Sequence, residues 1–515
     1  MRLPLAHATE ARPDDPSGHT ATARYVGRHR RPEHTKRRWP HRPRAAQPVD
    51  AAVAAARPRP RFGERRVVQW AVGVLVLIMA AGPFLEFVRP VDVRTWLLRS
   101  CVLLILVWYL GRPLAVLLFR QRERKHEATD PLSGISVVIP CHNVQPTIVD
   151  SLRSVLEQDV DCPIEVLLVE NNSTDDTMDR LFAIELEHPE TVHVLRVRPS
   201  PDEFPAAVAV NFGIQRARYD VIVRMDDDTT LAPSALREIV RQLRRPGIVG
   251  VACNLRVANP KATVWTRFQS IEYMLAMELD RRSQVLMDSI VCASGGLSAF
   301  RRDAMLDVGG YSTVQSVSED LELTLKCQKV GRIAMAPKAI GYTSCPPTLP
   351  KLLKQRVRWG TNGTIGASLH VRGFFNRTYW STGMTGFYGL PTKFVATVRE
   401  LLPIALADML WQAFHLSGWA GLLVLIGFPT AIQLLQILIL APALVMRQGL
   451  RYVALSPVFL FVYGPLLTVA RFVGGIRAAI LFVPSKRRSR ADNFAASASE
   501  EDVAAMGLAT ELATS

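Results

Sequence analysis

Three consecutive carboxylates, Asp226, Asp227 and Asp228, directly follow the strand-like run Tyr219–Arg224. Neighbouring carboxylates at the end of an apolar strand repel one another unless a cation lies between them. Asp226 and Asp228 are two residues apart, so on an extended chain their side chains point to the same side. The spacing therefore predicts a divalent-cation site, and a solvated acidic turn is the alternative interpretation.

A second acidic pair, Glu319 and Asp320, opens a helix-like run further along the chain. Acids at a helix start could simply complement the helix dipole. They could equally supply a general base that takes a proton from an attacking hydroxyl group. The residues alone leave both interpretations open.

A third group lies in the segment PKLLKQRVRW, which places Gln355, Arg358 and Trp359 on neighbouring positions of one helix face. A basic amphipathic helix of this kind could lie at a membrane interface, with Trp359 as its anchor. Alternatively, Arg358 neutralises a diphosphate and Trp359 offers a flat apolar face to a sugar ring. Both interpretations can hold, because a helix has more than one side.

Short β-branched runs alternate with helix-like stretches from about residue 134 onward, which indicates a parallel sheet in an α/β domain. Ligands of such sheets bind beyond the carboxyl ends of the strands, so we expect the chemistry there. The predicted strands are Ile135–Pro140, Ile164–Val169, Val192–Val197 and Tyr219–Arg224, and the predicted helices lie near Thr147–Glu157 and Asp175–Glu187.

Hydrophobic residues make up 49% of the 515 residues, but they are unevenly spread. Val67–Val88 and Trp96–Phe119 are each long enough to cross a hydrocarbon layer of roughly 30 Å. Further apolar runs are Leu401–Trp411, Gly418–Met446 and Val453–Phe472. The pattern predicts a globular domain carried between membrane segments.

The formal net charge of +16 comes largely from residues 1–66, where 16 Lys and Arg less 6 Asp and Glu give +10. We expect this tail to be disordered and to hold the N-terminus in the cytoplasm by the positive-inside rule. It carries only three aromatic residues, Tyr25, Trp39 and Phe62, and we expect no nucleic-acid partner. The seven cysteines contain no CxxC pair and indicate neither a disulfide framework nor a zinc site.

Five motifs occur in a fixed order: PxxN (Pro140, Asn143), NNSTDDT, DDD, SED and QxxRW. Together they resemble the processive glycosyltransferases of family 2, such as cellulose, hyaluronan, chitin and poly-N-acetylglucosamine synthases. The resemblance covers residues 134–364 and the flanking apolar runs. It implies an α/β fold, with a GT-A-type nucleotide-sugar-binding domain between N- and C-terminal transmembrane helices.

The resemblance also implies a role for each matching residue. Asp228 would hold Mg²⁺ or Mn²⁺, and Asp320, with Glu319 beside it, would be the catalytic base. The acceptor would lie against Trp359, Gly295 and Gly296. The nucleotide-sugar would be bound by Pro140, Asn143, Glu170, Asn171, Asp226, Gln355 and Arg358, where Glu170-Asn171 departs from the family's usual pair of aspartates.

The expected organisation follows the apolar runs and the motifs. Residues 1–66 form a disordered basic cytoplasmic tail, 67–120 two transmembrane helices, 130–350 the GT-A domain, 351–398 the QxxRW and interfacial helices, 399–484 the C-terminal transmembrane helices, and 485–515 a disordered cytoplasmic tail.

The resemblance implies an inverting enzyme that transfers sugar from a UDP-sugar donor to a growing glycan and so makes a β-linked polysaccharide. The enzyme would be a multi-pass protein of the inner or plasma membrane, with a cytoplasmic catalytic domain. Its product would be exported, and further proteins could take part in that export. Two alternatives stay open: a non-processive synthase that adds one sugar to a membrane lipid acceptor, and a transporter or scaffold with an inactive transferase domain.

Overall fold

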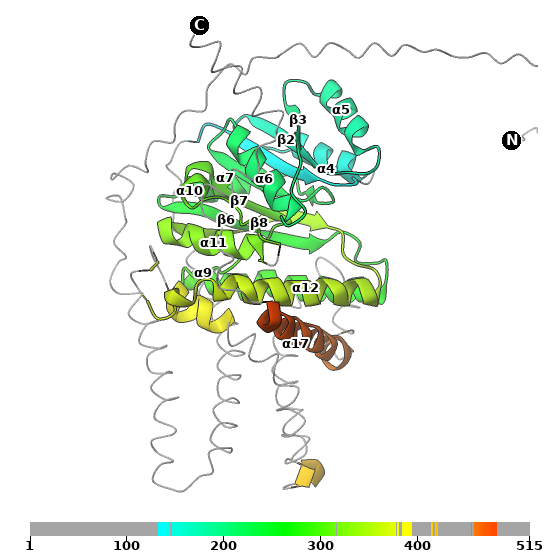
Figure 1. Ribbon diagram of the computed structural model, residues 1–515, viewed down its shortest axis with the longest axis vertical. Coiled ribbons are helices and arrows are strands. Elements are labelled where there is room, and N and C mark those ends of the chain that lie inside the picture. Colours follow the sequence, from blue (N-terminus) through cyan, green and yellow to red (C-terminus); the bar gives the residue numbers. More distant parts are fainter. Residues whose placement is uncertain are drawn as a thin grey trace, which may run out of the picture. The chain divides into compact units, whose positions relative to one another are not determined.

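The computed structural model describes residues 132–144, 147–315, 317–376, 379–380, 384–393, 414–415, 418–420, 455 and 458–481. The predicted N-terminal spans, both predicted tails, the run Leu401–Trp411 and nearly all of Gly418–Met446 lie outside these residues. Figure 1 shows an α/β domain in which a twisted sheet is flanked by helices, with α12 (Leu349–Ser368) and α17 (Gly464–Leu481) packed beside each other.

The described residues form a sheet of eight strands in the order β3-β2-β1-β4-β7-β6-β8-β5. The strands are β1 (Ile135–Cys141), β2 (Ile164–Asn171), β3 (Val192–Val197), β4 (Val221–Met225), β5 (Thr230–Leu231), β6 (Ile248–Val257), β7 (Leu297–Arg301) and β8 (Arg332–Thr343). Strands β1 to β4 pair in parallel, whereas β7 runs antiparallel between β4 and β6. β6 and β8 are again parallel, and β5 is an antiparallel edge strand.

Helices connect these strands. The helices with most bearing on the site are α8, α11, α12 and α17. In chain order the helices that the structure describes are α4 (Thr147–Leu156), α5 (Thr177–Glu187), α6 (Pro205–Arg216), α7 (Ala235–Leu243), α8 (Val264–Leu275), the π-helical η2 (Ala276–Arg281), α9 (Arg282–Leu286), α10 (Arg302–Asp307), α11 (Glu319–Val330), α12, the 3₁₀ turn η3 (Val371–Gly373), the π-helical η4 (Thr385–Gly389) and η5 (Phe459–Tyr463), and α17.

The parallel half of the sheet forms as its sequence predicts. Every residue of β1 is buried, as a near-continuous apolar run should be in a strand covered on both faces. Helix α6 covers this half closely, because a Cβ on Gly213 would lie only 2.5 Å from Cγ1 of Val138. The predicted strands before residue 226 and the two predicted helices are confirmed to within about two residues at each end.

The C-terminal helix α17 packs against α12 and is tied to the sheet domain through Glu272 of α8. The carboxylate of Glu272 accepts hydrogen bonds from Arg356 (2.7 Å), the Tyr463 hydroxyl (2.6 Å) and Arg471 (3.2 Å). Burial alone would raise the pKa of Glu272, but Arg356 and Arg471 hold it below its usual range. Glu272 is therefore an ionised carboxylate shared by three elements.

Of the helices that the structure describes, α17 alone has the length and apolar composition to cross a membrane, and one such helix is weak evidence for a span. It overlaps the predicted run Val453–Phe472 but begins and ends later, because the π-helical turn η5 precedes it. The α/β part of the predicted fold class is confirmed, and the flanking membrane helices stay a prediction.

Candidate active site

The acidic turn after β4 lies against the loop that precedes β7. In the antiparallel pair of these strands Met225 is opposite Leu297, so the residues after Met225 and those before Leu297 emerge side by side. The backbone NH of Asp226 donates to the carbonyl oxygen of Gly296 (3.3 Å). A Cβ on Gly296 would lie 3.4 Å from Oδ2 of Asp226, so this glycine is within van der Waals reach of the acid. The topology therefore brings the DDD motif to the Gly295-Gly296 loop.

The three acids of this turn repel one another when they are ionised. Burial, followed by repulsion from Asp226 and Asp228, raises the pKa of Asp227 to about 7. Burial and Asp226 also raise the pKa of Asp228, whose Oδ1 accepts a hydrogen bond from the Thr343 hydroxyl (3.2 Å). The turn thus holds negative charge at a free-energy cost that a bound cation would offset.

The carboxylates of Asp226 and Asp228 are suitable donors for a hard divalent cation. Within the described ranges, no group of three or more His, Cys, Asp or Glu side chains is arranged to hold a metal ion. Magnesium sites commonly use one or two carboxylates and take their remaining ligands from water and substrate phosphates. The residues present fit a cation of that kind, with a phosphate-bearing ligand completing the coordination.

A buried cation, Arg224 of β4, lies behind the acids. Its Nη2 is 3.0 Å from Oε1 of Glu319 and 4.0 Å from Oδ1 of Asp226, and its side chain is 4% exposed. The guanidinium also lies 4.9 Å from the ring centroid of Tyr311 and would be 3.0 Å from a Cβ on Gly295. Burial lowers the pKa of Arg224, but Glu319, Tyr311 and Asp226 raise it more, so the side chain stays charged. Arg224 joins β4, the glycine loop and the start of α11.

Asp320, in the first turn of α11, is fixed at the same loop. Its Oδ2 accepts hydrogen bonds from the Gly295 backbone NH (3.1 Å) and the Cys292 thiol (3.5 Å). Its Oδ1 accepts from the Ser318 hydroxyl (2.6 Å) and the Leu321 backbone NH (2.7 Å). Burial raises the pKa of Cys292 to about 12, so this neighbour is a neutral donor. The carboxylate is held in one position, next to the predicted acceptor loop.

The loops after β1 and β2 are tied together at the same edge of the sheet. Asn143 adopts a left-handed φ of 51°, and its Oδ1 accepts from the backbone NH of Thr174 (2.9 Å). Glu170, whose side chain is 2% exposed, accepts from the Ser173 backbone NH (2.6 Å) and lies 3.2 Å from Nε of Arg196. Glu170 thus shapes its own turn in addition to any contact with a nucleotide.

Pro140 and Asn171 are strand residues of this edge. Pro140 is opposite Val169 in the β1–β2 pair and lies beyond the β1–β4 pairing, where its missing NH is tolerated. Asn171 is buried, and its carbonyl oxygen lies 2.9 Å from Nδ1 of His142. Both residues support the loops that follow their strands.

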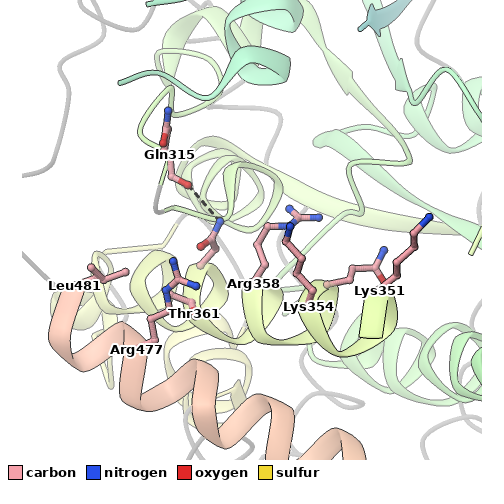
Figure 2. Close-up of a pocket in the computed structure, with 9 residues that line it drawn as sticks. Gln315, Lys351, Lys354, Arg358, Thr361, Arg477 and Leu481 are labelled. Atoms are coloured by element: carbon pink, nitrogen blue, oxygen red, sulfur yellow. Dashed lines mark hydrogen bonds between the residues drawn. The ribbon is translucent and has the colours of Figure 1, made fainter. Parts of the chain in front are cut away.

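Helix α12 meets the SED motif directly, because the backbone NH of Ser318 donates to the carbonyl oxygen of Asn362 (3.1 Å). Gln355 and Arg358 of this helix line a cavity of about 600 Å³ (Figure 2). Trp359 does not line that cavity; it is 41% exposed, and Cζ of Arg356 lies 4.2 Å from its ring centroid. The three residues of the QxxRW motif therefore divide between the cavity and the flank of the helix.

The part of the chain from β1 into α12 also matches a known family. Residues 131–362 match the family described as "Glycosyltransferase like family 2". These residues form a family 2 glycosyltransferase domain. Relatives include the poly-beta-1,6-N-acetyl-D-glucosamine synthases of Staphylococcus aureus (strain COL), 30% identical over 236 residues, and of Staphylococcus epidermidis, 28% identical over 253 residues.

The two alignments cover 45% and 49% of this chain and 55% and 58% of the synthases, so the chain spans little more than half the length of these relatives. A solved mannosyltransferase from Pyrobaculum calidifontis, in complex with GDP-Man and Mn²⁺, is 18% identical, with a TM-score of 0.45 over 74% of this chain and 97% of its own.

Within the family 2 domain the predicted site residues fall into three groups. Asp226, Asp228, Gly295, Gly296, Glu319 and Asp320 form one cluster through the contacts of Arg224 and Asp320 and the β4–β7 pairing. Gln355 and Arg358 share the cavity, and the Ser318–Asn362 hydrogen bond links α12 to the first cluster. Pro140, Asn143, Glu170 and Asn171 form the third group, at the ends of β1 and β2.

Two residues of the family 2 domain that organise this site are not among the predicted site residues. Arg224 ends the predicted strand Tyr219–Arg224, and Arg356 lies inside QxxRW at a position that the motif leaves free. The sequence does contain a signal for both residues: each is an arginine beside acids or on an apolar helix face. An arginine buried in such a place needs a carboxylate partner. Glu319 and Glu272 are those partners.

Proposed function

We propose that this protein is a membrane-bound, inverting glycosyltransferase that polymerises sugar from a UDP-sugar donor into a β-linked polysaccharide, with export of the product. The meeting of the acidic turn, the glycine loop and Asp320 at the carboxyl end of β4 supports this activity most directly. Open α/β sheets bind their ligands at that position.

The donor would lie between the strand ends and α12. The loops carrying Pro140, Asn143, Glu170 and Asn171 would receive the nucleoside, and Asp226 the nucleotide-sugar. Gln355 and Arg358 would bind the diphosphate from the cavity on α12. Mg²⁺ or Mn²⁺, held by Asp228, would neutralise charge on the departing diphosphate.

Asp320 would act on the acceptor. Its Oδ2 lies at the glycine loop, so an acceptor hydroxyl brought there could pass its proton to the carboxylate as it attacks the sugar. Glu319 would support this arrangement by pairing with Arg224. Attack by the hydroxyl on the face opposite the leaving diphosphate inverts the anomeric centre, so the chain needs no side chain as nucleophile.

The membrane setting is part of the proposal. The apolar runs outside the described residues support a multi-pass protein of the inner or plasma membrane, with its catalytic domain in the cytoplasm. The domain boundaries predicted from the apolar runs belong to the same proposal. The name of the staphylococcal relatives makes N-acetylglucosamine the first sugar to test.

The proposal is tested by incubating membranes that contain the full chain with a panel of labelled UDP-sugars, with Mg²⁺, with Mn²⁺ or with EDTA. We expect one donor to yield a labelled polymer that a linkage-specific glycosidase digests, and EDTA to abolish its formation. A labelled lipid carrying a single sugar would instead establish the glycolipid-synthase alternative. Absence of both UDP release and product with every donor would contradict enzyme activity.

Replacing Trp359 with Ala should shorten the polymer more than it weakens UDP binding. Arg356 lies against the indole ring, and the exposed remainder of the indole is free to stack on a sugar. Loss of this surface should cost about 1–2 kcal/mol of acceptor binding, or roughly 5- to 30-fold in retention of the growing chain. Product length is measured by gel filtration, and UDP affinity by calorimetry.

Trp359→Phe is the matched control, because it keeps a flat ring beside Arg356 and should preserve most of the chain length. Polymer of unchanged length from the Ala variant would remove the stacking role. Equal losses in UDP affinity and chain length would point to a general disturbance of α12.

A further inference from the structure

The cavity on α12 is strongly cationic, and not all of its charge comes from the glycosyltransferase motif. Lys351, Lys354 and Arg358 line it from α12, and Arg477 lines it from α17. Figure 2 shows the three α12 side chains rising from one side of their helix and Arg477 entering from α17 on the same side. No Asp or Glu is among the described residues that line this cationic cavity.

Other arginines on the same two helices do form ion pairs. Arg356 of α12 and Arg471 of α17 both pair with Glu272. In the described part of the chain, none of the four cavity cations forms an ion pair with a carboxylate. Like charges gathered without a counter-charge repel one another, and this arrangement is typical of a site that is neutralised by an anionic ligand.

The shape of the charged surface suits a ligand with more than one phosphate. Lys351, Lys354 and Arg358 are three and four residues apart, so they line one helix face over about 10 Å. Uncharged donors, the amides of Gln355 and Asn362, line the same space. A pair of linked phosphates can take charge-assisted hydrogen bonds from several such groups at once.

Asn362 connects the cationic cavity to the proposed catalytic base, Asp320. Its carbonyl oxygen accepts from Ser318, and the Ser318 hydroxyl donates to Asp320. We propose that Arg477 binds the diphosphate of the sugar donor together with Arg358, so that the C-terminal helix completes the donor site. This inference rests on the proposed function, and it adds a residue that lies more than one hundred residues beyond the matched domain.

Small residues hold α17 close enough for this role. A Cβ on Gly474 would lie 2.7 Å from the carbonyl oxygen of Val357, and one on Gly360 would lie 3.2 Å from that of Arg471. The two backbones therefore touch one turn before Arg477. Donor binding and the docking of α17 on α12 are thereby coupled, since each favours the other.

The test uses the full chain in nanodiscs and compares its affinity for uridine, UMP and UDP by calorimetry. Arg477→Gln should weaken UDP binding about tenfold or more and leave uridine binding unchanged, because uridine has no phosphate. The thermal midpoint should not fall, since the substitution removes repulsion rather than an ion pair. Lys338→Gln, at an exposed position of β8 that does not line the cavity, removes the same charge and should change nothing.

Each other outcome is decisive. A wild-type chain that binds no UDP overturns the proposed function itself. A variant that binds UDP as tightly as the wild type overturns only the role of Arg477. Equal losses for uridine and UDP would show a displaced helix instead of a lost phosphate contact. Unchanged UDP affinity with weaker binding of phosphate-bearing anionic lipid vesicles would assign the cavity to a lipid headgroup and overturn the proposal.

Discussion

Substitution of Asp320 by Asn is expected to reduce sugar transfer by about 10²- to 10⁴-fold while UDP still binds. The carboxylate is held by Gly295, Cys292, Ser318 and the start of α11, and an amide of the same shape keeps an oxygen in this position. What it loses is the ability to accept the proton of the attacking hydroxyl. Transfer is measured as polymer formed per unit time, and binding by calorimetry with UDP.

The matched control is Asp303→Asn, the same change at an exposed position of α10 outside the acid cluster, which should leave transfer at the wild-type rate. Near-normal turnover of the Asp320 variant would show that another group is the base. Loss of UDP binding together with transfer would show that Asp320 serves the donor and not the acceptor.

Substitution of Arg224 by Met should lower the free energy of unfolding by about 3 kcal/mol or more, because it leaves Glu319 buried without its partner. The side chains of Arg224 and Glu319 are 4% and 13% exposed, so solvent cannot replace the lost guanidinium. Burial already raises the pKa of Glu319, Arg224 opposes this rise, and Asp320 adds to it. Stability is measured by denaturant unfolding of the full chain in detergent.

The double variant Arg224→Met, Glu319→Gln separates charge from packing, because it removes both members of the pair and should regain much of the lost stability. The deficit of the single variant should also depend on pH. Without Arg224, the pKa of Glu319 in the folded protein lies further above its value in the unfolded chain, so stability falls as the pH rises through that interval. The deficit should therefore be smaller at about pH 5 than at about pH 8, and a deficit independent of pH would contradict an electrostatic origin.

Local sequence patterns predict the first half of the sheet because its strands are covered on both faces and each is flanked by a helix. β1 and β2 begin at Ile135 and Ile164 as predicted, and the acids after Arg224 lie at a strand end. The antiparallel insertion of β7 was not predictable in this way. It depends on pairing Met225 with Leu297, and these residues are far apart in the chain. The spacing of apolar residues within a short segment carries no information about such a contact.

The motifs identify residue types but not their surroundings. Glu170 was predicted as a nucleotide ligand, and its carboxylate also binds Ser173 and pairs with Arg196. Trp359 was placed on one helix face with Arg358, yet the indole packs against Arg356 on the flank of α12. These differences depend on which side of each element the fold covers, and the covering elements come from distant parts of the chain.

The ion pair between Glu272 and Arg471 joins residues 199 positions apart, whereas Glu272 and Arg356 are 84 apart. During synthesis α8 and α12 leave the ribosome first, so Glu272 already has one arginine when α17 arrives. Helix α17 then packs against α8 and α12, which already hold the Glu272 carboxylate in place, so the domain from β1 to α12 can fold before α17 is present. A nascent chain that stops short of Phe459 would keep the Glu272–Arg356 bond but lack the surface that α17 covers.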